Sequence, residues 1–106
     1  SMLEDPAWRE QLMLFSKEKL DYDRMERWFR PVAEFAGRTG APIYCSEFGC
    51  WDPAPRPSQI NWFRDTLRLF EKYDVAWAQW EYGCLYERDG TPKPPLDVLF
   101  PERQRR

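Results

Sequence analysis

The stretch APIYCSEFGCW, residues 41–51, decides how this sequence is interpreted. Residues 42–47 form a short, largely apolar run without strict alternation, which favours a strand covered on both faces, as in a parallel sheet. Glu47 stands at the far end of that strand, and Gly49 follows two residues later. A buried carboxylate is unfavourable unless a partner or a chemical role compensates it. Glu47 is therefore the first candidate functional residue, with a carboxylate paired to an arginine or capped by backbone N–H groups as the alternative.

A helix and a second strand follow this strand. Apolar residues recur at spacings of three and four over residues 59–72, after Ser58 as a candidate N-cap. The apolar run at residues 75–81 then predicts the second strand. A strand–helix–strand unit makes a parallel pair with a right-handed crossover. We therefore predict an α/β fold with two parallel strands, at about residues 42–47 and 75–81.

Two further helices are expected before the first strand, and a helical turn near the end of the chain. An Asp-Pro pair predicts a helix start, so residues 6–19 form the first helix. Asp21 can cap a second helix over about residues 22–37, in which Pro31 should introduce a kink or divide the helix in two. With the helix between the strands and a last turn in residues 96–100, we expect three to four helices.

The 106 residues suffice for one small domain. Ser1-Met2 has the form of a tag remnant, and we treat residues 3–106 as a single unit. A net charge of −2 gives no electrostatic reason to expect nucleic acid or an anionic membrane as a partner. We expect no membrane helix, because no apolar run approaches the ~20 residues that one needs. We also expect no signal peptide among these residues, and the localisation is unknown.

Three cysteines, Cys45, Cys50 and Cys84, make an odd number, which argues against a closed disulfide framework. The sequence contains no histidine and no Cys-x-x-Cys pair, so a zinc site would lack its usual ligands. The absence of histidine also removes the Ser-His and Cys-His catalytic arrangements. We expect free thiols with a structural role, no metal site and no cofactor.

Three segments together resemble the last part of glycoside hydrolase family 5, a cellulase-like family of (β/α)8 barrels: PIYCSEFG (42–49), VAWAQWEYG (75–83) and ERDGTPKPPL (87–96). The resemblance implies a partial (β/α)8 barrel, the C-terminal quarter with the seventh and eighth strands, from a retaining enzyme that acts on β-linked polysaccharide. In the family, a Glu-Phe-Gly element at the end of the seventh strand carries the nucleophile, which matches Glu47. A tryptophan on the eighth strand floors the sugar subsite, which matches Trp80.

Other residues near the strand ends are further candidates. Trp51 lies in the proline-rich loop after the first strand and could bind a sugar, with a plain surface loop as the alternative. Trp77 and Trp80 are three residues apart and therefore face opposite sides of a regular strand. We expect Trp77 in the core and Trp80 in a cleft. Glu81 follows Trp80 and could line the mouth of the cleft or be solvated. We expect it to be solvated and to point away from the cleft.

The resemblance leaves the catalytic set incomplete. Retaining glycosidases use two carboxylates about 5–5.5 Å apart. In the family, the acid/base glutamate lies in an Asn-Glu-Pro element on the fourth strand, and this sequence contains no such element. The chain therefore holds one half of a catalytic pair, and we expect it to be inactive alone.

The expected partner is a second copy of the chain or a complementary barrel fragment, and carbohydrate is a candidate ligand. Two parallel strands leave both sheet edges unpaired, and unpaired edges favour association. We expect Ile43 and Cys45 to be exposed together with Trp77 or Trp80. A dimer or tetramer, with helices or strands exchanged between copies, would cover them. Two other functions stay open: a non-catalytic carbohydrate-binding module, and a structural or assembly unit derived from a barrel.

Overall fold

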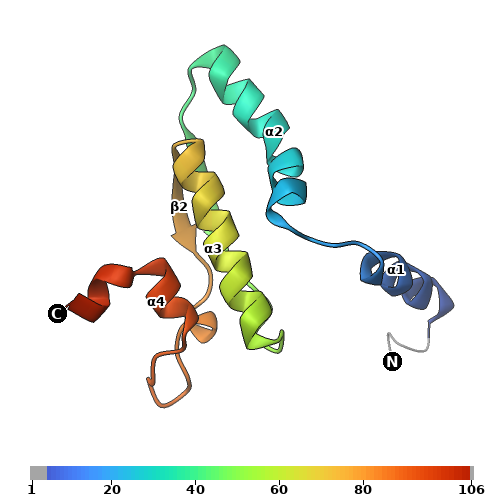
Figure 1. The fold of residues 1–106 in the computed structure, drawn as a ribbon, viewed down its shortest axis with the longest axis vertical. Helices are drawn as coiled ribbons and strands as arrows, with labels where there is room; N and C mark the ends of the chain where they lie inside the picture. The colour runs from blue at the N-terminus through green and yellow to red at the C-terminus, as the bar shows by residue number, and fades with distance from the viewer. Residues whose placement is uncertain (1–4, 106) are drawn as a thin grey trace.

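The computed structural model describes residues 5–105. In chain order, the elements are α1 (Pro6–Ser16), α2 (Tyr22–Thr39), β1 (Ile43–Phe48), α3 (Arg56–Lys72), β2 (Val75–Gln79), the 3-10 turn η2 (Tyr82–Cys84), α4 (Pro95–Leu99) and the 3-10 turn η3 (Pro101–Arg105) (Figure 1). Ser1-Met2, interpreted as a tag remnant, lies outside the described residues. The treatment of residues 3–106 as one unit stays a prediction.

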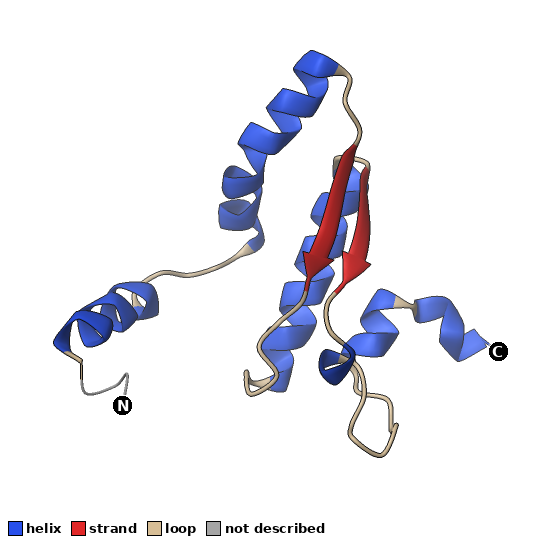
Figure 2. Ribbon diagram, turned by 180° about the vertical axis from the view of Figure 1, so that it is seen from behind, coloured by secondary structure: helices blue, strands red, loops and turns tan. Residues whose placement is uncertain are grey.

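The two strands form a parallel sheet, and α3 is the crossover between them (Figure 2). The predicted α/β class with two parallel strands is therefore confirmed. β1 begins and ends one residue later than predicted, and β2 ends at Gln79 rather than at residue 81. Beyond Gln79, the N–H of Trp80 still donates to the carbonyl of Phe48 at 2.7 Å, and the chain then turns into η2.

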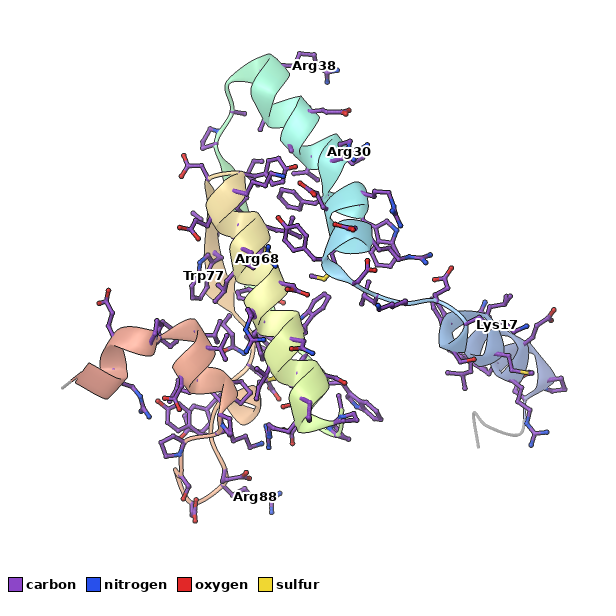
Figure 3. The ribbon with its side chains drawn as sticks, viewed as in Figure 1. Lys17, Arg30, Arg38, Arg68, Trp77 and Arg88 are labelled. Carbon is purple, nitrogen blue, oxygen red and sulfur yellow. The ribbon has the colours of Figure 1, made fainter. Side chains whose placement is uncertain are left out.

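One face of the sheet packs against α3 and the C-terminal segment. The ring of Phe48 lies edge-on to the rings of Phe63, Phe70 and Trp77, with centroids 5.9, 5.1 and 5.3 Å apart. Leu96 of α4 is also buried in this cluster. Trp77, labelled in Figure 3, is half-buried against the cluster, as predicted. The helical spacing predicted for α3 is confirmed, because its apolar residues supply this buried side.

The opposite face of the sheet is open within residues 5–105. Its exposed residues are Tyr44, Ser46 and Glu47 on β1 and Ala76 on β2. The expected burial of β1 on both faces is therefore wrong for this chain, because no described element covers that face (Figure 2). The expected exposure of Ile43 and Cys45 is also wrong: side chains alternate along a strand, and these two are half-buried against the core.

The helix ends follow only partly from the sequence. Asp21 caps α2 as predicted, because its carboxylate accepts a hydrogen bond from the N–H of Arg24 at 3.0 Å. α2 then continues as one helix through Pro31, so the predicted division at that residue is wrong. α3 begins two residues before Ser58, with a proline in its first turn, so Ser58 is not its cap.

A small polar and aromatic cluster attaches α2 to α3. The rings of Phe29 and Tyr73 lie 5.4 Å apart. The Glu26 carboxylate pairs with the Lys72 ammonium and accepts from the Tyr73 hydroxyl at 2.6 Å. The bond from Lys72 has the largest effect on the pKa of Glu26, followed by the bond from Tyr73, and both lower this pKa below its ordinary value. The bond to Glu26 raises the pKa of Lys72 and of Tyr73.

α1 stands apart from the other elements and has no buried residue; Lys17, labelled in Figure 3, follows its last residue. The radius of gyration is 16.4 Å, whereas a compact chain of this length has about 13 Å. The accessible surface is 8353 Å², about 2,000 Å² more than a compact monomer of this mass exposes. The described fold is therefore open. None of its helices is long and apolar enough to cross a membrane.

Candidate functional site

An irregularity in β1 turns Glu47 to the open side of the sheet. The parallel register pairs Cys45 with Trp77 and Phe48 with Gln79, so β1 has one residue more than β2 between these pairs. With regular alternation, Glu47 would lie on the core side together with Cys45. The extra residue gives that position to Phe48 instead and leaves Glu47 exposed. Within residues 5–105, the Glu47 carboxylate has no hydrogen-bond or ion-pair partner, so no described residue supports the alternative of a satisfied structural carboxylate.

Gly49 allows the ends of the two strands to approach closely. A Cβ atom at Gly49 would lie 1.7 Å from the carbonyl oxygen of Trp80. On the other side, the indole N–H of Trp62 donates to the carbonyl oxygen of Gly49 at 2.7 Å. The backbone that follows Glu47 is therefore held between α3 and the end of β2, and this spacing requires a residue without a side chain.

An open cleft of about 740 Å³ lies over the strand ends, and it brings together all three residues predicted for the site. Glu47 and the exposed rings of Trp51 and Trp80 line it. Trp80 lines this cleft, as expected, and its role in binding a sugar stays a prediction. Glu81 is exposed, as expected, but it lines the same cleft, so the expectation that it points away is wrong. Strand alternation does not extend to Glu81, because β2 ends at Gln79.

Two buried polar residues that the sequence analysis did not single out fix the loop that carries Trp51. Gln59 on α3 donates through Nε2 to the carbonyl oxygens of Trp51 and Asp52, at 3.2 and 2.7 Å. Lys93, whose side chain is 6% exposed, donates to Asp52 Oδ1 and to the carbonyl oxygen of Gly83, both at 2.7 Å. The loop is therefore tied to α3 and to η2, while Trp51 and Asp52 stay exposed at the surface.

The arrangement combines an unpartnered carboxylate with exposed aromatic rings. Exposed indole rings such as those of Trp51 and Trp80 can stack on the apolar faces of sugars. A carboxylate that is free of partners, such as Glu47, can act as a nucleophile. Glu81 supplies a second carboxylate to the cleft, whereas Asp52 is paired with Lys93. The described residues contain no group of three or more His, Cys, Asp or Glu side chains that could hold a metal ion.

Comparison with known proteins relates this chain to part of several endoglucanases. It is 32% identical over 85 residues to Endoglucanase C of Acetivibrio thermocellus and to Endoglucanase C307 of Clostridium sp. strain F1. Each alignment covers 76% of this chain and 25% of the relative. The chain therefore spans about a quarter of the length of the curated relatives that it matches. No protein-family profile matches the chain.

Solved structures have the same fold over a similar share of the chain. An endoglucanase superposes with a TM-score of 0.68 at 23% sequence identity, over 77% of this chain and 28% of that chain. A hyperthermophilic endo-β-1,4-glucanase in complex with substrate superposes with a TM-score of 0.66 at 28% identity, over 73% of this chain and 26% of that chain. The predicted relation to cellulase-like glycosidases is therefore confirmed at this coarse level.

Proposed function

We propose that this chain is the C-terminal quarter of a (β/α)8 barrel of glycoside hydrolase family 5, from a retaining enzyme that cleaves a β-linked glucan. The observation that carries the proposal is the position of Glu47 and Trp80, which come from different strands and line one cleft at the C-terminal ends of both. Barrel enzymes have their chemistry at that end of the strands. The partial similarity to endoglucanases supports the class of substrate.

In the proposed reaction, Trp80 holds a glucosyl unit by stacking, and the Glu47 carboxylate attacks its anomeric carbon. The glycosidic bond breaks, the leaving oxygen takes a proton from a general acid, and water later hydrolyses the glycosyl–enzyme ester. The extra residue in β1 serves this role, because it places the Glu47 carboxylate on the open side of the sheet. Trp51 forms a second wall, held in position through Gln59 and Lys93.

The chain alone lacks the general acid that this reaction needs. A general acid needs surroundings that keep its proton, usually burial or a close like charge. Glu81, the second unpaired carboxylate of the cleft, is exposed instead. Without an acid, turnover is expected to fall by about 10²–10⁴-fold, and further because the rest of the subsite is missing. We therefore expect no turnover from the 106-residue chain alone.

Association would complete the site and cover the open surface. The excess accessible surface of about 2,000 Å² exceeds the roughly 800 Å² that each partner buries in a standard interface. The open sheet face and both strand edges offer this surface to a complementary barrel fragment or to a second copy, in a dimer or tetramer. Light scattering at micromolar concentration should report a dimer or larger, and a monodisperse monomer of 12.9 kDa would contradict self-association.

Complementation tests the catalytic proposal directly. The chain is mixed with a polypeptide that comprises the preceding three quarters of a related endoglucanase, and hydrolysis of carboxymethylcellulose and aryl glycosides is measured. We expect turnover from the mixture, loss of turnover with Glu47→Gln, and retained turnover with Glu71→Gln, an exposed carboxylate on α3 outside the cleft, as the matched control. Turnover that persists in Glu47→Gln would remove the nucleophile assignment. Turnover by the chain alone that Glu47→Gln abolishes would show a complete site in this chain.

A second candidate function is non-catalytic carbohydrate binding, which is favoured by the exposure of Trp51 and Trp80, 74% and 60%, in one cleft. Binding to an open cleft should be weak, at millimolar dissociation constants or about −4 kcal/mol. Titration with cello-oligosaccharides should quench tryptophan fluorescence, less so in Trp80→Ala. Trp28→Ala, an exposed position on α2, is the control. Micromolar affinity that is unchanged in Trp80→Ala would remove the platform assignment.

A further inference from the structure

Two of the three cysteines meet beside the cleft, at the ends of the two strands. All three are free thiols in the structure. Cys84 of η2 is buried, and its Sγ donates to the carbonyl oxygen of Cys50, 34 residues earlier, at 3.0 Å. Cys50 is half-buried, and both residues line the cleft that contains Glu47. Burial raises the pKa of Cys50 to about 11, and the adjacent Cys84 thiol adds to the rise. The Cys84 thiol is therefore in contact with Cys50, and it influences the pKa of the Cys50 thiol.

We propose that Cys50 and Cys84 form a dithiol site that a small-molecule disulfide converts into an intramolecular disulfide. In the first exchange, the thiolate of one cysteine attacks a sulfur of the small disulfide and displaces one thiolate, which gives a mixed disulfide. In the second exchange, the other cysteine attacks the protein sulfur of that mixed disulfide and displaces the second thiolate. Two protons pass from the protein thiols to the two released thiolates, so one dithiol is oxidised and one disulfide is reduced.

Cys45 has no such neighbour and serves as the internal control. Its Sγ donates to the backbone carbonyl oxygen of Glu47, within the same strand, at 3.4 Å. It is half-buried against the core on the covered face of the sheet. The structure therefore distinguishes a pair, Cys50 and Cys84, from a single cysteine.

The disulfide would join the loop after β1 to the segment after β2. Lys93 already connects the same two segments, through Asp52 on one side and the carbonyl oxygen of Gly83 on the other. A covalent bond at this place would fix the wall that carries Trp51 relative to the end of β2 that carries Trp80. This inference concerns the thiols alone and does not depend on the proposed hydrolase activity.

Oxidation of the full chain by glutathione disulfide at mildly alkaline pH tests the site. We expect the number of titratable thiols to fall from three to one, a mass decrease of two hydrogen atoms, and a cross-linked peptide that contains Cys50 and Cys84. Cys45→Ser should form the same disulfide. Cys50→Ser, at the half-exposed member of the pair, should not form it. The measurement on the wild-type chain needs no variant, so it stands even if a substitution at Cys84 prevents folding.

Three results would overturn the proposal. The first is a chain that keeps all three thiols after prolonged oxidation. The second is a stable mixed disulfide with glutathione at Cys50, which would show that Cys84 cannot reach it. The third is cross-linking through Cys45 as the main product, either within a chain or between two chains.

Discussion

The backbone of Gly49 passes so close to that of Trp80 that a Cβ atom on the glycine would lie 1.7 Å from the tryptophan carbonyl oxygen. Because the neighbouring atoms are backbone atoms, no side-chain rotation can make room for an added methyl group. The glycine of the Glu-Phe-Gly element is therefore a packing requirement at the place where the two strand ends meet.

Gly49→Ala should lower the free energy of unfolding by at least the 1–3 kcal/mol or so that overpacking typically costs. It should also displace Trp80 and with it one side of the cleft. Urea unfolding followed by circular dichroism measures the first effect, and tryptophan emission measures the second.

Gly37→Ala is the matched control for this substitution. Gly37 lies within α2, and a Cβ atom there would meet no atom within 4 Å. The control should raise stability by roughly 0.5–1 kcal/mol, because alanine is the better helix former. If Gly49→Ala were as stable as the wild type, the close approach of the strand ends would be wrong.

Lys93→Met should destabilise the loop that carries Trp51. The substitution keeps the length of the aliphatic side chain and removes two hydrogen bonds of a buried ammonium group, to Asp52 and to the Gly83 carbonyl. Hydrogen bonds from charged groups contribute roughly 1.5–3 kcal/mol each, and the half-exposed Asp52 regains part of this from water. Hydrogen exchange should therefore be faster at residues 50–55.

Lys72→Met is the control for Lys93→Met, because it removes an ammonium group from a pair in which the lysine is half-exposed. Lys72 lies at the opposite end of α3 from the loop, so hydrogen exchange at residues 50–55 should not change in this variant. Equal effects of the two substitutions, or unchanged exchange in the loop of Lys93→Met, would show that Lys93 does not hold the loop.

The attachment of α2 to α3 should weaken in acid. The bonds from Lys72 and Tyr73 lower the pKa of Glu26 below its ordinary value of 4.5, so the carboxylate form is stabilised in the folded chain. That contribution is complete above pH 4.5 and is lost as the pH falls through the lowered pKa. The free energy of unfolding, measured over this range, should fall more steeply in the wild type than in Glu26→Gln. If the free energy of unfolding changed with pH in the same way in both proteins, Glu26 would not stabilise the attachment of α2 to α3.

The rate of alkylation should show that the Cys50 thiol is mostly protonated at neutral pH. Burial, and after it the neighbouring Cys84 thiol and Asp52, raise the pKa of Cys50 to about 11, whereas Arg56 opposes the rise. Since only the thiolate reacts, iodoacetamide should modify Cys50 slowly at neutral pH and faster as the pH rises toward 11. Replacing Cys84 by alanine should increase the rate at neutral pH. A rate that reaches its half-maximum near the ordinary thiol value of 9.0 would contradict this assignment.

The sequence predicted the elements that depend on local periodicity. The helical spacing of α3 and the apolar runs of β1 and β2 were sufficient for a parallel pair, and a parallel pair brings both strand ends to one edge. The sequence therefore predicts that Glu47 and Trp80 lie close together. The resemblance, rather than the spacing, supplied their proposed roles.

Features that depend on contacts between distant residues could not be predicted in this way. The extra residue in β1 changes which side chains face the core, and apolar patterning does not locate such an irregularity. Lys93 lies in a proline-rich turn, so its burial becomes visible only when Asp52 and Gly83 surround it. For Gln59, the sequence contains one sign of burial. It stands four residues before Phe63 and therefore on the same, buried side of α3.

The separation of α1 from the other elements has a consequence for how the chain acquires structure. α1 has 11 residues, and isolated helices shorter than ~12–15 residues are marginal in water. Its apolar side chains are exposed at every described position: Trp8, Leu12, Met13, Leu14 and Phe15. We therefore expect α1 to become more stable when a partner surface covers these side chains, as in coupled folding and binding. Its ellipticity and its resistance to proteolysis should rise with protein concentration or with an added barrel fragment, so α1 can report on assembly.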